Sequence, residues 1–147
     1  MLSYLGTPDG AEPTTVQTDT VTLPKPRRTR ATAKKAGSSF ERLIADWLAA
    51  RLNDDRIDRR VKHGAHDRGD IAGVRTIRGG RVVIECKNVA QLALPAWLRE
   101  AELERANDDA LIGVVVHKKR GTTDPAEQYV TMTVATFAAL LEGGVDL

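Results

Sequence analysis

The stretch RGDIAGVRTIRGGRVVIECKN, residues 68–88, contains two apolar segments with charged residues at their ends. We expect Asp70–Ile77 and Arg81–Lys87 to form two strands joined by a glycine-rich hairpin turn. Because side chains alternate between the faces of a strand, Glu85 and Lys87 should point the same way, with Cys86 opposite. Hairpin pairing would bring Asp70 near both of them. The sequence therefore predicts two carboxylates and one ammonium clustered at one end of a sheet.

Such a cluster favours metal-assisted chemistry, because buried charges are costly unless they pair or bind an ion. Two carboxylates and a backbone carbonyl are hard oxygen ligands that suit Mg²⁺ or Mn²⁺. A lysine beside such an ion can orient an attacking water or contact a phosphate, so phosphodiester hydrolysis is the natural match. The alternative is a salt bridge at a strand edge without any catalytic role.

The remaining pattern predicts an α/β fold, a mixed central β-sheet flanked by helices. Apolar residues at helical spacing indicate a first helix over residues 37–52, where Ser38 and Glu41 match a capping box. A second helix is expected over residues 94–107, with Leu103 on its apolar face, and a short final helix should end at Gly143. Further strands are expected in residues 56–62, 110–118 and 128–134.

The charge distribution separates a basic N-terminal arm from a nearly neutral body. The chain has 147 residues and a net charge of +2, yet residues 20–36 hold six basic residues and no acid. Residues 1–37 lack sustained periodicity, so we expect a disordered arm there and one domain over residues 38–147. Such an arm favours nucleic acid, although it could merely keep the chain soluble.

Composition also indicates the cellular compartment in which the protein works. The single cysteine cannot form an internal disulfide, and the longest apolar run is too short to cross a membrane. The N-terminus lacks the apolar core of a secretory signal. We therefore expect a cytoplasmic protein without a membrane partner, in a bacterial host cell if a phage encodes it.

Asp70 followed by Glu85-x-Lys87 at a strand end resembles the core of the PD-(D/E)xK nuclease superfamily. The order of elements over residues 37–120, with Ile84-Glu-Cys-Lys-Asn88 inside it, is most similar to the archaeal-type and phage Holliday junction resolvases of that superfamily. One departure is Gly69, which stands where the family has proline before the aspartate. The resemblance implies a restriction-endonuclease-like core, a homodimer, and cleavage that leaves 5′-phosphate and 3′-hydroxyl ends.

The resemblance also assigns roles to residues. Asp70, Glu85 and the backbone carbonyl of Cys86 would bind Mg²⁺ or Mn²⁺, and Lys87 would serve the attacking water or the scissile phosphate. Glu41 would be a further carboxylate at the site, unless it caps the first helix. Basic residues expected to contact DNA are Arg27, Arg28, Arg30, Lys34, Lys35, Arg59, Arg60, Lys62, Lys118, Lys119 and Arg120.

These features together predict a Mg²⁺-dependent, structure-selective DNA endonuclease that acts on branched DNA in recombination or repair. One alternative is another nuclease of the superfamily, acting on duplex DNA or on DNA ends. A second is a DNA-binding accessory protein that kept the fold and lost cleavage. An RNA-binding protein ranks last, because only 4% of the residues are aromatic and few are available for base stacking.

Overall fold

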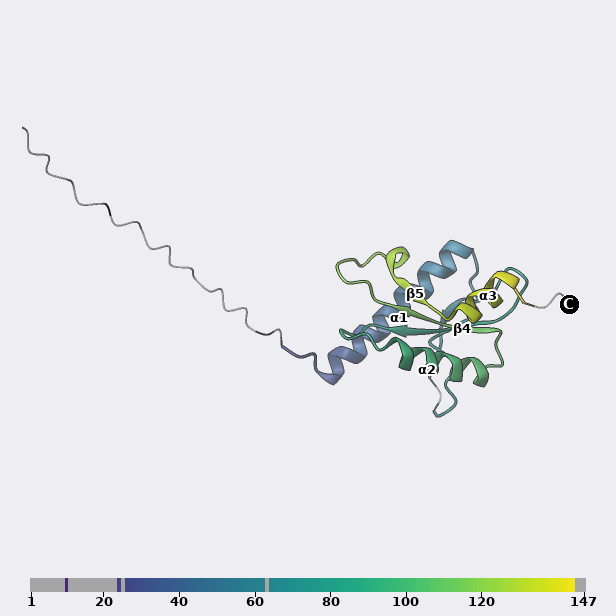
Figure 1. The fold of residues 1–147 in the computed structure, drawn as a ribbon, viewed down its shortest axis with the longest axis horizontal. Helices are drawn as coiled ribbons and strands as arrows, with labels where there is room; N and C mark the ends of the chain where they lie inside the picture. Colours follow the sequence, from purple (N-terminus) through teal and green to yellow (C-terminus); the bar gives the residue numbers. More distant parts are fainter. Residues whose placement is uncertain (1–9, 11–23, 25, 63, 145–147) are drawn as a thin grey trace, which may run out of the picture.

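A computed structural model describes Gly10, Pro24 and residues 26–62 and 64–144 (Figure 1). The described residues form an α/β fold with one five-stranded mixed sheet. The elements are α1 (Arg30–Leu52), β1 (Asp58–Arg59), β2 (Ile71–Ala72), β3 (Val82–Lys87), α2 (Leu94–Asn107), β4 (Ile112–His117), a 3₁₀ turn (Pro125–Glu127), β5 (Tyr129–Thr131) and α3 (Val134–Glu142). The predicted fold class and the predicted order of helices and strands are thus confirmed.

The sheet has the strand order β1-β2-β3-β4-β5, and its one parallel pair is β3 with β4. Helix α2 connects these two strands, because a parallel pair needs a crossover rather than a tight turn. The register pairs Ile71 with Ile84, which places Asp70 opposite Glu85. The pairing of β3 with β4 sets Lys87 beside His117 at the end of β4.

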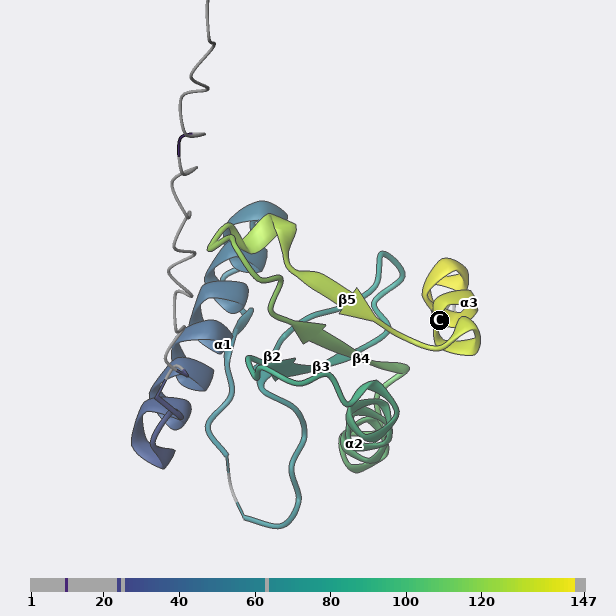
Figure 2. The ribbon, with the colours of Figure 1, turned by 60° about the vertical axis from the view of Figure 1, so that its left-hand side comes forward.

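The sheet carries helices on both faces (Figure 2). Ile84 and alternate residues of β4 pack with Phe40 and Ile44 of α1 in the main core, and Leu140 of α3 packs against the same core. On the other face, Val115 packs with Trp97 and Ala101 of α2. Because Glu85 and Lys87 alternate with Ile84 along β3, they lie on the face that α2 covers.

Helix α1 begins at Arg30, seven residues before the expected start at Gly37. Thr29 is the residue that caps it, since its hydroxyl accepts a hydrogen bond from the backbone N–H of Thr32 at 3.2 Å. The capping box of Ser38 and Glu41 was therefore a wrong prediction, because Ser38 lies inside the helix. Most of the predicted disordered arm, residues 1–9, 11–23 and 25, lies outside the described residues.

The first strand of the predicted hairpin is interrupted. Only Ile71–Ala72 is a regular strand, followed by an isolated bridge between Arg75 and Arg81. Gly73 separates the two parts with a φ of +84°, and a Cβ there would lie 2.2 Å from the carbonyl oxygen of Arg56. This close approach shifts the pairing by one residue, as in a β-bulge. Asp70 nevertheless keeps the predicted place opposite β3.

Gly113 of β4 allows α2 to lie close to the sheet, and Gly113→Ala is expected to destabilise the fold by about 2–3 kcal/mol. A Cβ at this position would lie 2.5 Å from the carbonyl oxygen of Ala101, so the helix would have to move. Gly37→Ala is the matched control, because a Cβ at residue 37 meets no atom within 4 Å. Replacing this helical glycine should stabilise the chain by roughly 0.5–1 kcal/mol. Thermal unfolding measures both changes, and equal effects would contradict the close packing of α2.

Candidate functional site: an acidic pocket at the end of β3

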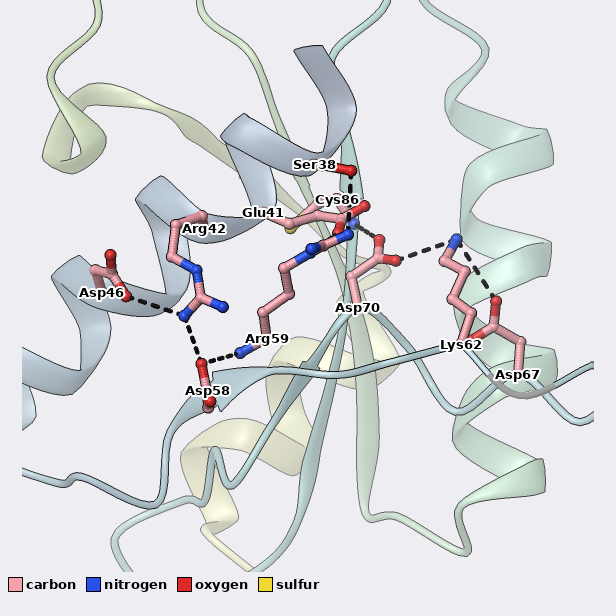
Figure 3. A network of polar contacts seen from close by, with 10 residues as sticks. All are labelled: Ser38, Glu41, Arg42, Asp46, Asp58, Arg59, Lys62, Asp67, Asp70 and Cys86. Atoms are coloured by element: carbon pink, nitrogen blue, oxygen red, sulfur yellow. Dashed lines mark hydrogen bonds and ion pairs between the residues drawn. The ribbon is translucent and has the colours of Figure 1, made fainter. Parts of the chain in front are cut away.

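Asp70 and Glu85 lie side by side because β2 and β3 pair. The Asp70 N–H donates to the Ile84 carbonyl at 2.8 Å, and the Asp70 Oδ2 accepts from the Cys86 N–H at 2.7 Å (Figure 3). Asp70 is 1% exposed and Glu85 is 4% exposed. Two carboxyl groups are thus buried together at one end of the sheet, as the sequence predicted.

Two lysines approach these acids from different elements. Lys62, from the segment after β1, places Nζ 3.2 Å from Asp70 Oδ1 and 3.7 Å from Asp67. Lys87 places Nζ 2.8 Å from Glu85 Oε1 and also pairs with Glu100 of α2. Burial lowers the pKa of Lys87, but its hydrogen bonds to Glu100 and Glu85 outweigh this effect and raise the pKa overall. Lys87 is therefore an ammonium at neutral pH.

Sequence reasoning missed one acid of the pocket, Glu104 of α2, which is 6% exposed. The predicted apolar face contained Leu103, which is 64% exposed instead. The buried residues Trp97, Ala101 and Glu104 follow the spacing i, i+4, i+7, so Glu104 occupies a position where a helix buries apolar side chains. A glutamate at that spacing was the signal that could have revealed it.

The carboxyl groups of Glu85 and Glu104 interact directly. Burial, then the neighbouring Asp70, raises the pKa of Glu85. Burial, then the charge and hydrogen bonding of Glu85, raises the pKa of Glu104 to about 9. Like charges at short range disfavour the doubly ionised pair, so at neutral pH and without a cation the pair retains a proton.

Glu41 lies on the other side of β3, where Figure 3 shows it beside Cys86 and Asp70. Its carboxylate accepts a hydrogen bond from Arg59 Nε at 2.6 Å, and the same guanidinium donates to the Ser38 hydroxyl at 3.1 Å. Glu41 is thus an ion-pair partner of Arg59 rather than a cap. To join Asp70 at an ion, it would have to exchange this arginine for the ion.

The pocket has donor atoms that fit Mg²⁺, although they do not converge. Asp70 Oδ1, Glu85 Oε2 and Glu104 Oε2 are buried without an aligned hydrogen bond, even though Lys62 lies at ion-pair distance from the first. Carboxylate oxygens are the ligands that Mg²⁺ and Mn²⁺ prefer. Within the described residues, however, no three acidic, imidazole or thiol side chains are placed to hold one ion. Two lysines neutralise the acids in this arrangement.

Part of the predicted basic set lines two adjoining grooves. The predicted residues Lys34, Arg59, Arg60 and Lys62 line a groove of about 310 Å³ together with Arg42, which was not predicted. Arg60 and Lys62 also line a second groove of about 630 Å³ with His66 and Arg68. Arg59 is paired with Glu41 and Arg60 with Asp108, whereas Lys62 connects both grooves to Asp70.

The other predicted basic residues lie apart from these grooves. Arg27, Arg28, Arg30 and Lys35 are exposed on and before the first turns of α1. Lys118, Lys119 and Arg120 follow β4, at the end of the sheet where Lys87 lies. Lys118 bonds the Thr122 carbonyl, and Lys119 lies 3.7 Å from Glu127. Arg120 is exposed.

Without divalent cations, the free energy of unfolding should fall as the pH rises from about 4.5 to about 9. Glu104 has a pKa of about 9 in the folded chain against an ordinary 4.5, so the folded chain keeps a proton that the unfolded chain releases. The slope should reach at most about 1.4 kcal/mol per pH unit.

Urea unfolding in EDTA at several pH values tests this prediction. Glu104→Gln should reduce the slope, and the part that Glu85 contributes, whose pKa burial and Asp70 raise, should remain. Glu102→Gln should not, because Glu102 is exposed and paired with Arg105 at 2.7 Å. Equal slopes in wild type and Glu104→Gln would contradict the prediction.

No family model, curated protein or solved structure matches this chain. None of the helices in the described residues is both long and apolar enough to cross a bilayer.

Proposed function

We propose that this chain is a Mg²⁺- or Mn²⁺-dependent DNA endonuclease of the PD-(D/E)xK type. The observation that carries the proposal is the juxtaposition of buried Asp70 and Glu85 with the ammonium of Lys87 at one end of the sheet. A pair of buried like charges is costly for the folded chain, so a function is the better explanation for keeping both. The register that sets residue 70 opposite residue 85 supports the resemblance to the family's motif.

The residues of the pocket have separable roles in this proposal. Asp70 and Glu85 would hold the ion, with the Cys86 carbonyl and Glu41 as further ligands. When bound, Mg²⁺ would neutralise charge on the phosphate and activate a water for attack. Lys87 is protonated at neutral pH, so it would donate to the phosphate or orient the water rather than remove a proton. The water oxygen would bond to phosphorus and lose a proton to solvent as the P–O3′ bond breaks. The departing 3′ oxygen would take up a proton from solvent, which leaves a 5′-phosphate and a 3′-hydroxyl.

The basic grooves and the exposed cations on α1 would hold the DNA backbone. Phosphate contacts from lysine and arginine give affinity without reading sequence, and this affinity weakens as salt increases. Lys62 lies between groove and pocket, so it can exchange Asp70 for a phosphate when an ion binds.

We further propose a four-way junction as the preferred substrate, cut by a homodimer that presents one pocket to each of two strands. Cleavage of a labelled junction, a matched linear duplex and a DNA end, each with Mg²⁺, tests this choice. Paired symmetric nicks in the junction alone are expected. Equal cutting of all three substrates would leave the nuclease and remove the junction preference.

A DNA-binding accessory protein is the second candidate, and one observation favours it. No three potential ligands converge within the described residues, and lysines neutralise both acids. This candidate predicts tight junction binding without cleavage in Mg²⁺ or Mn²⁺. The same assay therefore separates the two functions.

A further inference from the structure

No cation among the described residues pairs with Glu104, whose carboxyl group meets that of another buried acid, Glu85. Glu104 lies on the buried face of α2, one turn after Ala101, which belongs to the small core on that face of the sheet. Its Oε2 accepts no hydrogen bond, and no ion pair joins it to another described residue. By contrast, Glu100 and Glu102 of the same helix pair with Lys87 and Arg105.

The neighbours of Glu104 are acids rather than cations. Its carboxyl group lies within hydrogen-bonding distance of Glu85, and it interacts electrostatically with Asp67 and Asp70. Asp70 and Glu85 each bury an oxygen that also lacks an aligned hydrogen bond. Asp70, Glu85 and Glu104 thus each bury one carboxylate oxygen without an aligned hydrogen bond, and each side chain is more than nine-tenths buried.

Burying a carboxyl group without a partner costs stability, and an apolar side chain would fit a position between Ala101 and the sheet better. A divalent cation is a small ligand that would satisfy such carboxylate oxygens. We propose that Glu104 is a further carboxylate of the divalent-cation site, supplied by α2 to the ion that Asp70 and Glu85 hold. This inference rests on the proposed function and adds a residue outside the Asp…Glu-x-Lys motif.

In the arrangement described, the carboxyl groups do not yet converge on one point. Lys62 and Lys87 hold Asp70 and Glu85, so an ion would have to replace ammonium contacts at both acids. Glu104 needs no such exchange, since no lysine or arginine among the described residues pairs with it. Its carboxyl group contacts that of Glu85, so an incoming ion would have to enter between two acids that repel each other when both are ionised.

Mn²⁺ binding to the full chain, measured by titration calorimetry without DNA, tests this proposal. Glu104→Gln should weaken Mn²⁺ binding about 10-fold or more, and should raise the melting temperature in EDTA by roughly 4 °C or more. Glu102→Gln is the control on the same helix and should change neither quantity by much. Glu104→Asp keeps the negative charge but brings it one methylene group closer to the helix backbone, so it should bind Mn²⁺ with intermediate affinity.

The possible outcomes are distinct. Wild-type Mn²⁺ affinity in Glu104→Gln would overturn the role of Glu104 and leave the proposed function intact. A wild-type chain that binds no Mn²⁺ would overturn both the role of Glu104 and the proposed metal-dependent function. A Glu104→Gln chain that is less stable than wild type in EDTA, or fails to fold, would show that Glu104 supports the fold, and would likewise overturn the proposal.

Discussion

Asp70→Asn is expected to lower the rate of Mg²⁺-dependent DNA cleavage about 10³-fold or more, with the fold retained. Asp70 is the most deeply buried acid of the pocket, and one of its oxygens is fixed by the Cys86 N–H at 2.7 Å. The amide can still accept that hydrogen bond, but it cannot offer a negative charge to an ion. A loss of several kcal/mol of transition-state stabilisation corresponds to this change in rate.

Asp67→Asn is the matched control. Asp67 lies three residues away, contacts the same lysine at 3.7 Å, and is only partly buried. Single-turnover cleavage at saturating enzyme compares the two variants with wild type, and circular dichroism verifies their folding. Cleavage by Asp70→Asn within a few-fold of wild type would mean that the ion, and hence the chemistry, lies elsewhere.

Lys87→Met should reduce cleavage about 10²–10³-fold while DNA binding changes less than about threefold. Lys87 Nζ contacts Glu85 and Glu100 inside the pocket. Its replacement therefore removes a positive charge beside the reacting phosphate, but few contacts to the other phosphates of the DNA. The same change should destabilise the cation-free chain by about 3 kcal/mol, because it leaves Glu85 buried without its cation. Mg²⁺ should restore part of this stability.

Lys119→Met provides the comparison for Lys87→Met. Lys119 is a lysine at the same end of the sheet, but it is partly exposed and lies 3.7 Å from Glu127. Lys119→Met should weaken DNA binding modestly and leave the cleavage rate of bound DNA unchanged. If both variants lost binding and cleavage in the same proportion, Lys87 would be a DNA contact and not part of the reaction.

The sequence predicted the fold well because its signals were local. Strand alternation and the glycine-containing turn placed Glu85 and Lys87 on one face and Asp70 opposite them, as the register has it. The bounds of α2, Leu94–Asn107, agree with the pattern, and Gly143 ends α3 in a left-handed conformation. Each of these features depends on residues close together in the chain.

One error was local, and the other two came where contacts between residues far apart in the chain determine the structure. Thr29 starts α1 earlier than the composition of the arm suggested, because a threonine cap outweighs a weak apolar pattern. Glu41 resembled a capping residue, yet Arg59, 18 residues later, takes its carboxylate. Glu104 was overlooked because a glutamate on a helix is normally solvated, and only the approach of α2 to β3 buries it.

A crystal structure with Mn²⁺ tests the central claim most directly, because anomalous scattering locates the ion without reference to activity. We predict a peak about 2.0–2.2 Å from carboxylate oxygens of Asp70 and Glu85, with Lys62 withdrawn from Asp70. A pocket that keeps the Lys62–Asp70 pair at 3.2 Å and shows no peak in saturating Mn²⁺ would contradict the account.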